Sequence, residues 1–304
     1  MIRMLALQLA SAAMMMASLT GLAIGQGGAE PTAQPRVTVQ TGVLEGRREG
    51  GINIFKNIPY AQPPVGDLRW APPQAVAPWP GVRNASEFGP SCTQISIPRS
   101  SIYFDPPIVQ SEDCLSLNVW APENARNLPV IVWIHGGSLR IGGAAQPFYD
   151  GAVFAHQDVV FVSINYRLGA LGWMAHPELS AESPEGVSGN YGFLDQIAAL
   201  LWVQDNISAF GGDPDQVTLM GESAGALSVS YHLISPLSRG LFSRAIIEST
   251  NLRAFPRLRE AAHGLPSAES TGLSVSEALG AERLSELRDM DADSLTQGAA
   301  RAGF

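Results

Sequence analysis

The chain has 304 residues, of which 45% are hydrophobic, so it is long enough to bury one large core. Its formal net charge of -9 argues against nucleic acid and anionic membrane surfaces as partners, because both bind through clustered Lys and Arg. The sequence contains no metal-ligand cluster, phosphate-binding loop or dinucleotide fingerprint, so we expect neither a metal nor a cofactor.

Residues 1–25 have the features of an export signal. Arg3 precedes an apolar stretch rich in Met and Ala, and Ala23–Gly25 places small residues at the two positions that a signal peptidase reads. An uncleaved membrane anchor is the alternative, but polar residues interrupt the apolar run and no basic stop follows it. We predict a secreted or periplasmic protein with no membrane attachment after cleavage, a linker over residues 26–35 and one domain over residues 36–304.

The first predicted elements of the domain are two short antiparallel strands, over residues 36–39 and 42–46. A Pro-rich stretch from Pro59 to Pro80 follows them. We expect this whole segment to coat the outside of the domain rather than to enter its core.

Further along the chain, strand patterns and helix patterns alternate. Residues 115–120 alternate in polarity, and near-continuous apolar runs, typical of central strands, occupy residues 130–134, 159–164, 217–220 and 245–247. Helical spacing of apolar residues predicts helices over residues 190–209 and 224–234, and helices without strands in the tail 261–304. This alternation predicts an α/β fold with a mostly parallel central sheet flanked by helices.

The chain has two cysteines, Cys92 and Cys114, separated by a loop rich in Pro and Ser. An exported chain would meet an oxidising compartment, so we expect a disulfide between them. Two unrelated thiols are the alternative. Tyr103 and Phe104 lie inside this loop, where they either line the entrance to a site or pack on the surface.

The pentapeptide Gly221–Gly225 reads Gly-Glu-Ser-Ala-Gly and directly follows the apolar run 217–220. A Gly-x-Ser-x-Gly sequence between a strand and a helix is typical of a sharp turn that exposes a nucleophilic serine, here Ser223. Gly221 and Gly225 would leave room for the strand and the helix to pass closely. The alternative is an inert serine whose hydroxyl caps free N–H groups at the helix start.

A second motif lies upstream, where the predicted strand 130–134 ends in the turn His135–Ser138, with the sequence His-Gly-Gly-Ser. Turns of this kind supply backbone hydrogen-bond donors for an oxyanion in lipases and esterases. The two glycines could also simply end a strand. Two independent parts of one catalytic machinery thus occur in order along the chain.

These motifs and several others together resemble one family, the type-B carboxylesterases of the cholinesterase-like branch of the α/β-hydrolases. The resemblance runs from about Arg36 to Asn251. The stretches that carry it are Asn57–Ala61, Leu68–Trp70, Ser111–Asn118, His135–Gly137, Asn165–Gly169, Gly189–Gly192, Asp195–Gln196, Ala209–Pro214 and Gly221–Gly225. Within them, Glu112–Cys114 looks like the family's first disulfide, which supports the pairing of Cys92 with Cys114.

The resemblance implies an α/β-hydrolase fold and hydrolysis of a small-molecule carboxylic ester without a cofactor. It implies that Ser223 forms an acyl-enzyme and that the backbone N–H groups of Gly137, Ser138 and Ala224 bind the oxyanion. Ser138 stands where many relatives have a third glycine, but a backbone donor does not depend on the side chain. We interpret Glu222 as a structural support beside the nucleophile.

The two other residues of a serine triad are not evident. In this fold the acid and the histidine follow the serine in the chain, so Asp195 is interpreted as a buried structural carboxylate. His232 is nine residues after Ser223, roughly 13.5 Å along the same helix, and is interpreted as a packing or surface residue. His263 has only Glu248 and Glu260 nearby and lacks the family's acid-loop context.

We therefore predict that the triad acid and histidine are absent from this chain and that the sequence is an N-terminal fragment of a longer enzyme. A natural truncation, a frameshift product and a pseudogene product are the alternatives. A non-catalytic binding or adhesion domain, and an amidase or carbamate hydrolase, are competing functions. The sequence indicates neither the acyl and alcohol groups of the ester nor the oligomeric state.

Overall fold

A computed structural model describes residues 33–101, 109–250 and 256–304 of the chain. Residues Gln34–Phe304 form one compact unit. The predicted export signal lies outside the described residues, and so do Tyr103 and Phe104. No helix of the described part is long and apolar enough to cross a membrane.

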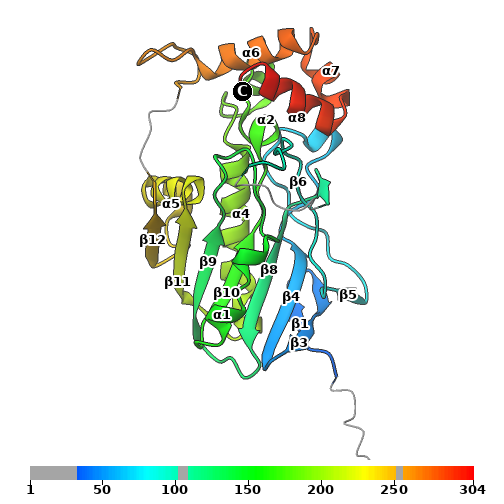
Figure 1. The fold of residues 1–304 in the computed structure, drawn as a ribbon, viewed down its shortest axis with the longest axis vertical. Helices are drawn as coiled ribbons and strands as arrows, with labels where there is room; N and C mark the ends of the chain where they lie inside the picture. Colours follow the sequence, from blue (N-terminus) through cyan, green and yellow to red (C-terminus); the bar gives the residue numbers. More distant parts are fainter. Residues whose placement is uncertain (1–32, 102–108, 251–255) are drawn as a thin grey trace, which may run out of the picture. The chain divides into compact units, whose positions relative to one another are not determined.

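Within the described residues, seven strands form the central sheet, in the order β12-β11-β9-β10-β8-β4-β3 (Figure 1). Four neighbours in this order pair in parallel: β12 (Arg244–Glu248), β11 (Gly212–Glu222), β9 (Leu128–Ile134) and β10 (Val160–Ile164). The other three pair antiparallel: β8 (Ser116–Pro122), β4 (Ile52–Pro59) and β3 (Arg47–Glu49). The sheet is therefore mixed, and the parallel arrangement predicted from the sequence holds for the four strands around the candidate site.

Several short strands and 3-10 helices lie outside the central sheet. β1 (Arg36–Val39) and β2 (Gly42–Glu45) pair antiparallel, as predicted, and β5 (Val82–Asn84) joins them in a separate sheet. β6 (Ser91–Cys92) and β7 (Gln110–Ser111) form a short parallel pair. Short 3-10 helices occupy Gly66–Leu68, Pro147–Tyr149, Ile207–Phe210 and Pro236–Ser238.

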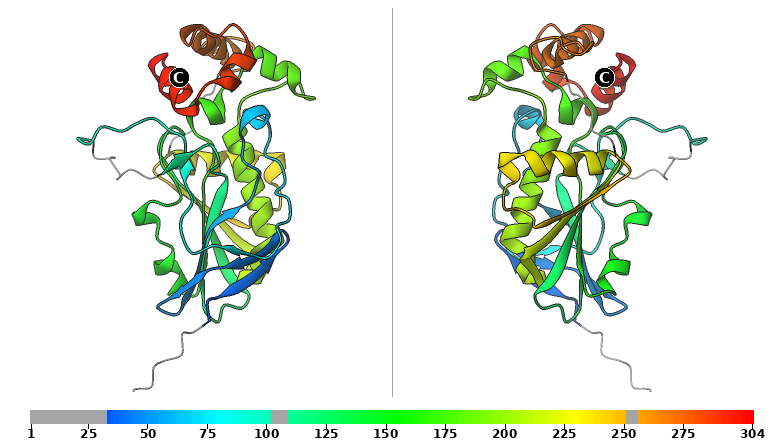
Figure 2. Two further views of the ribbon diagram at one scale, coloured as in Figure 1. Left: turned by 90° about the vertical axis from the view of Figure 1, so that its right-hand side faces the viewer. Right: turned by 90° about the vertical axis from the view of Figure 1, so that its left-hand side faces the viewer.

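Helices cover both faces of the central sheet. α4 (Tyr191–Asn206) and α5 (Ala224–Ile234), both predicted, lie on one face, and the short α1 (Ala152–Ala155) lies on the other (Figure 2). Side chains of one strand alternate between the two faces, so Val130 and Val132 join the core under α4, whereas Trp133 joins the core near α1. Burial of both faces explains why the central strands read as continuous apolar runs.

The prediction that the segment before residue 80 only coats the domain is wrong. β4 is an inner strand of the central sheet, and Phe55 and Ile58 on it are 1% and 0% exposed. The sequence pattern hid this strand because the pairing of β4 with β8 shifts register between Phe55 and Ile58, and Asn57 has a φ of 54°. Such a bulge breaks the alternation from which a strand is predicted.

Lys56 lies in this irregular part of β4 and is nearly buried, at 5% exposure. Its ammonium nitrogen is 3.6 Å from the centroid of the Phe88 ring, a cation–π contact. Burial lowers the pKa of Lys56 from its ordinary value. An isolated polar residue in the sequence pattern is thus accommodated inside the sheet by an aromatic partner.

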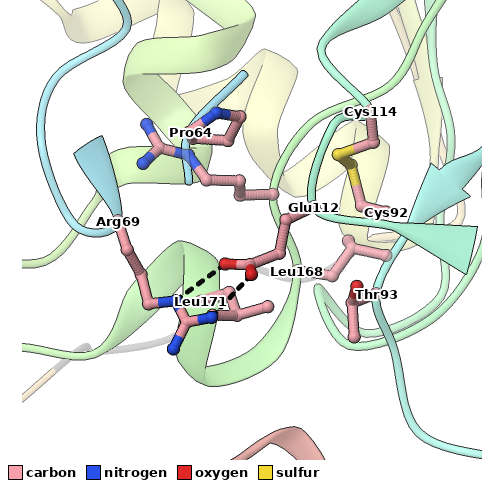
Figure 3. Close-up of a pocket in the computed structure, with 9 residues that line it drawn as sticks. Pro64, Arg69, Cys92, Thr93, Glu112, Cys114, Leu168 and Leu171 are labelled. Atoms are coloured by element: carbon pink, nitrogen blue, oxygen red, sulfur yellow. Dashed lines mark hydrogen bonds and ion pairs between the residues drawn. A yellow bond between two sulfur atoms is a disulfide. The ribbon is translucent and has the colours of Figure 1, made fainter. Parts of the chain in front are cut away.

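The tail of the chain is helical, as predicted, with α6 (Ala268–Ala278), α7 (Leu284–Asp289) and α8 (Ala292–Arg301). These helices share a second apolar core with α2 (Gly169–Trp173) and α3 (Pro177–Glu182). Arg69 ties them to the disulfide loop: it donates to the carbonyl oxygens of Leu287 and Met290 at 2.9 and 2.7 Å, and it pairs with Glu112 (Figure 3). The Pro-rich stretch therefore contributes a buried link between two parts of the domain.

Candidate active site

Ser223 lies at the junction of β11 and α5, the strand and the helix that the pentapeptide predicts. Its backbone has φ 53° and ψ −117°, a conformation that costs about 1–3 kcal/mol for a residue with a side chain. Neighbouring structure holds it there, because the Ser223 N–H donates to the Glu248 carbonyl at 2.9 Å and the Ser223 carbonyl accepts from Leu227 N at 2.9 Å. The Ser223 hydroxyl makes no capping hydrogen bond to the helix, which is contrary to the alternative of an inert capping serine.

The two glycines of the pentapeptide allow a close approach of main chains. A Cβ atom on Gly225 would overlap the carbonyl oxygen of Ile134, at the end of β9. A Cβ on Gly221 would lie 2.5 Å from the carbonyl carbon of Gly225. Strand β11, helix α5 and the end of β9 therefore meet at distances that only glycine permits.

The turn His135–Ser138 lies beside this elbow. β9 and β11 are parallel neighbours in which Ile134 is opposite Gly221, so both strands end at the same edge of the sheet. A Cβ on Gly136 would lie 2.9 Å from the carbonyl oxygen of Glu222 and 3.2 Å from Ser223 Cβ. The structure therefore brings together the two motifs, although 85 residues separate Gly136 from Gly221 in the sequence.

The turn has a strained backbone. Gly137, Ser138 and Leu139 have φ values of 100°, 57° and 62°. The carbonyl oxygen of Gly137 accepts from the N–H groups of Arg140 and Ile141, both at 3.0 Å. Ser138 is thus a non-glycine residue with a positive φ. Many type-B carboxylesterases have glycine at this position of the turn.

Glu222 and His135 flank the turn. Glu222 Oε2 would lie 2.9 Å from a Cβ on Gly136, so this carboxylate faces the turn. His135 is 1% exposed, its ring stacks on Tyr166 with centroids 4.4 Å apart, and its Nδ1 is 2.8 Å from the Gly136 carbonyl oxygen. Because a carbonyl oxygen only accepts, Nδ1 carries the proton. Burial lowers the pKa of His135 to about 4, so the ring is neutral at pH 7.

The two histidines that follow Ser223 in the chain lie in different surroundings. His232 is buried, with Nε2 at 3.0 Å from Gln196 Oε1 and Nδ1 at 2.7 Å from Ser238 Oγ. Both ring nitrogens are thus engaged, and burial lowers the pKa of His232 to about 3. This histidine is a packing residue, as predicted. His263 is exposed in a turn.

The acidic candidates also have structural partners or are exposed. Asp195 is 0% exposed and forms a two-point ion pair with Arg167, whose Nε and Nη2 each donate at 2.7 Å. It is therefore a buried structural carboxylate, as predicted. Glu260 pairs with Arg257 at 3.3 Å on the surface, and Glu248 is exposed.

The expected disulfide between Cys92 and Cys114 is present. It lies beside the Arg69–Glu112 ion pair, around a cavity of about 10 Å³ that is far too small for an ester (Figure 3). An open surface pocket of about 390 Å³ lies between α3 and the pair Arg259–Glu269. Ser223 lines neither cavity. Within the three described segments, no group of His, Cys, Asp or Glu residues is arranged to hold a metal ion.

Sequence reasoning missed the side chains that support the turn. Tyr166 donates from its hydroxyl to the His135 carbonyl at 2.8 Å, and Asn165 Oδ1 accepts from Ala144 N at 2.8 Å. Both residues are in a stretch that carries the family resemblance, which was the available signal. Gln94, whose side chain binds Gly142 just after the turn, had no such signal.

Comparison with known proteins gives a consistent result. A family model described as the carboxylesterase family matches residues 33–298. Fumonisin B1 esterase of Sphingopyxis macrogoltabida is 45% identical over 273 residues, which are 88% of this chain and 48% of that protein. Para-nitrobenzyl esterase of Bacillus subtilis is 43% identical over 267 residues, covering 86% of this chain and 52% of that protein.

Solved structures agree with these sequence matches. A thermophilic PNB esterase superposes with a TM-score of 0.79 at 42% identity, over 89% of this chain and 54% of that chain. This chain thus spans about half the length of the curated relatives it matches.

Proposed function

Because this chain belongs to the carboxylesterase family, we propose that it carries the nucleophile and the oxyanion turn of a serine-dependent carboxylic ester hydrolase. The observation that carries the proposal is the position of Ser223. It occupies a sharp elbow with a positive φ, and its Cβ lies close to the glycine turn that follows β9.

In the proposed reaction, Ser223 Oγ attacks the ester carbonyl carbon, and its proton passes to a general base. The carbonyl oxygen becomes an oxyanion bound by the N–H groups of Gly137, Ser138 and Ala224. The carbon–oxygen bond to the alcohol then breaks, and the alcohol leaves with the proton. Water attacks the acyl-enzyme by the same route, which releases the acid and restores Ser223.

We propose that the general base and its acid partner are not among these 304 residues. All five histidines lie in the described segments, and no hydrogen bond joins any of their rings to the Ser223 hydroxyl there. The fact that the chain spans about half the length of its curated relatives supports this view.

The proposed substrate class is a small carboxylic ester. The relatives are named for esters of differing structure, including fumonisin B1 and para-nitrobenzyl esters, so the proposal is limited to the ester group. The net charge of -9 is compatible with neutral and cationic esters. We further propose export to the periplasm or the medium, on the basis of residues 1–25.

The test is covalent labelling of Ser223 by a fluorophosphonate, with imidazole in the buffer as a diffusible base. The reagent bonds to Ser223 Oγ, fluoride leaves and imidazole takes the proton. We expect the labelling rate of Ser223 to rise with imidazole concentration, whereas the exposed Ser100 stays unlabelled and Ser223→Ala gives no adduct. Without imidazole, we expect p-nitrophenyl acetate to be hydrolysed no faster by the chain than by Ser223→Ala.

Two outcomes would contradict parts of this proposal. Labelling of Ser223 no faster than that of Ser100 at any imidazole concentration would favour a non-catalytic binding domain of the same fold. Turnover of p-nitrophenyl acetate that depends on Ser223 without imidazole would mean that the chain already contains its base.

A further inference from the structure

The disulfide loop contacts the segment after the oxyanion turn through the amide of one side chain, that of Gln94. Gln94 Oε1 accepts from Gly142 N at 2.8 Å, and Gln94 Nε2 donates to the Gly142 carbonyl at 2.7 Å. The same Nε2 donates to the Cys92 carbonyl at 3.0 Å. The Gln94 amide thus binds both polar groups of one residue and is itself fixed to the disulfide.

Gly142 packs against the first two residues of the turn, His135 and Gly136. It has a φ of 106°, and a Cβ built on it would lie 2.6 Å from His135 Nδ1 and 3.0 Å from the Gly136 carbonyl oxygen. Gly142 therefore packs directly on the His135 ring and on the hydrogen bond between His135 and Gly136. A shift of Gly142 would be transmitted to Gly136 because no free space separates them.

Gln94 is held in its own position from several sides. Its N–H donates to Gln110 Oε1 at 3.1 Å, and its carbonyl accepts from Gln297 Nε2 on α8 at 3.4 Å. Two residues before it, Cys92 is cross-linked to Cys114. These contacts fix the backbone of Gln94, and with it the position of the side-chain amide that binds Gly142.

We propose that Gln94 is a positioning residue that sets the geometry of the oxyanion turn Gly137–Ser138 from the disulfide loop. This inference rests on the proposed function. The turn has three successive residues with positive φ and two internal hydrogen bonds, both to the Gly137 carbonyl. Its other polar contacts come from outside, such as that of Gly169 N, which donates to the Leu139 carbonyl at 2.8 Å, so its geometry depends on external constraints. A misplacement of about 1 Å in a reacting geometry costs up to about 100-fold in rate.

The test compares Gln94→Ala with Gln62→Ala in the full chain. Gln62 is a matched control, because its side-chain amide also donates to a loop carbonyl, that of Ala75 at 2.8 Å, but does not contact the turn. Two readouts are measured: the rate of fluorophosphonate labelling of Ser223 with imidazole, and hydrogen exchange of the amides over residues 137–143. Gln94→Glu keeps the acceptor for Gly142 N but replaces the amide donor.

We expect Gln94→Ala to label Ser223 about 10- to 100-fold more slowly, with the same dependence on imidazole concentration as the wild type. Hydrogen exchange should speed up over residues 137–143 and stay unchanged in β9 and β11. The labelling rate of Gln94→Glu should fall between those of the wild type and Gln94→Ala. The labelling rate of Gln62→Ala should match that of the wild type within about twofold.

Three results would overturn the proposal. In the first, Ser223 of Gln94→Ala is labelled at the wild-type rate; in the second, amide exchange over residues 137–143 is unchanged in this variant. In the third, amide protection is lost throughout the sheet, which would mean that Gln94 has a general structural role. If wild-type Ser223 is not labelled at all, the proposed function fails, and the exchange data alone decide whether Gln94 holds the turn.

Discussion

The elbow at Ser223 and the turn over Gly137–Leu139 both have positive φ angles, yet they are held in different ways. The elbow is fixed by main-chain contacts, since Gly225 lies against the Ile134 carbonyl and Ser223 N donates to the Glu248 carbonyl. The turn depends on side chains, namely that of the neighbouring residue His135 and those of Tyr166 and Gln94 from distant segments. Substitutions at the elbow should therefore affect folding, whereas substitutions around the turn should affect local geometry.

The largest expected effect is that of Gly225→Ala. The added Cβ would overlap the Ile134 carbonyl, and neither the strand nor the helix can move away, so we expect a loss of more than about 3 kcal/mol in the free energy of unfolding. Chemical denaturation of both proteins measures this difference.

Gly240→Ala is the control in which the added methyl group overlaps nothing. Gly240 has a φ of 81° and nothing within 4 Å of its Cβ position, so alanine there should cost only about 1 kcal/mol. Equal losses in the two variants would show that the elbow does not depend on the close approach of main chains.

Removal of the disulfide should have the next largest effect. The double variant Cys92→Ser with Cys114→Ser releases a cross-link with a sequence separation of 22, and we expect it to lose about 3 kcal/mol of stability. Because Gln94 is anchored to Cys92, the variant should also exchange faster over residues 137–143. Reduced stability with unchanged exchange in this segment would separate the disulfide from the turn.

Acid should destabilise the protein through its buried histidines. The folded pKa values of His232 and His135 are about 3 and about 4, below the ordinary value near 6.5, so between these values the unfolded chain binds more protons. Stability should therefore fall as pH falls below about 6.5, by about 2 kcal/mol per histidine over two pH units.

A comparison of variants assigns this pH dependence. His232→Gln should flatten the fall in unfolding free energy between pH 6.5 and 4.5, whatever its effect at pH 7. His263→Asn is the control, because His263 is exposed and asparagine tolerates its φ of 54°. An unchanged slope in His232→Gln would mean that this ring is protonated in the folded state.

The smallest expected effect is a gain. Ser138→Gly relieves a φ of 57° in the turn and should stabilise the fold by no more than about 1 kcal/mol. Labelling of Ser223 should be unchanged, because the proposed donor at this position is the backbone N–H. A marked loss of labelling would assign a role to the Ser138 hydroxyl.

Local sequence signals predicted the elements that hold the elbow. The apolar runs gave β9, β10 and β11 and the helical spacing gave α4 and α5, because these elements bury regular faces. Strand β4 was missed because its bulge at Lys56 and Asn57 interrupts the alternation.

The long-range contacts of the loops could not be predicted from sequence patterns. Gln94 and Gly142 are 48 residues apart in irregular loops, and Arg69 reaches Met290 across 221 residues. No periodicity relates such pairs, since only the folded backbone brings them together. The motif sequences located the candidate site, whereas the contacts that set its geometry required the structure.

Because Lys56 is buried, proteolytic cleavage at this residue measures how often the sheet opens. Lys56 is the only lysine, so a lysine-specific protease has one cleavage site, inside an inner strand between β8 and β3. The Lys56 N–H also donates to the Ala85 carbonyl at 2.7 Å, so this stretch must leave the sheet before it can enter a protease cleft. The rate of cutting into two defined peptides then follows the population of molecules in which β4 has detached.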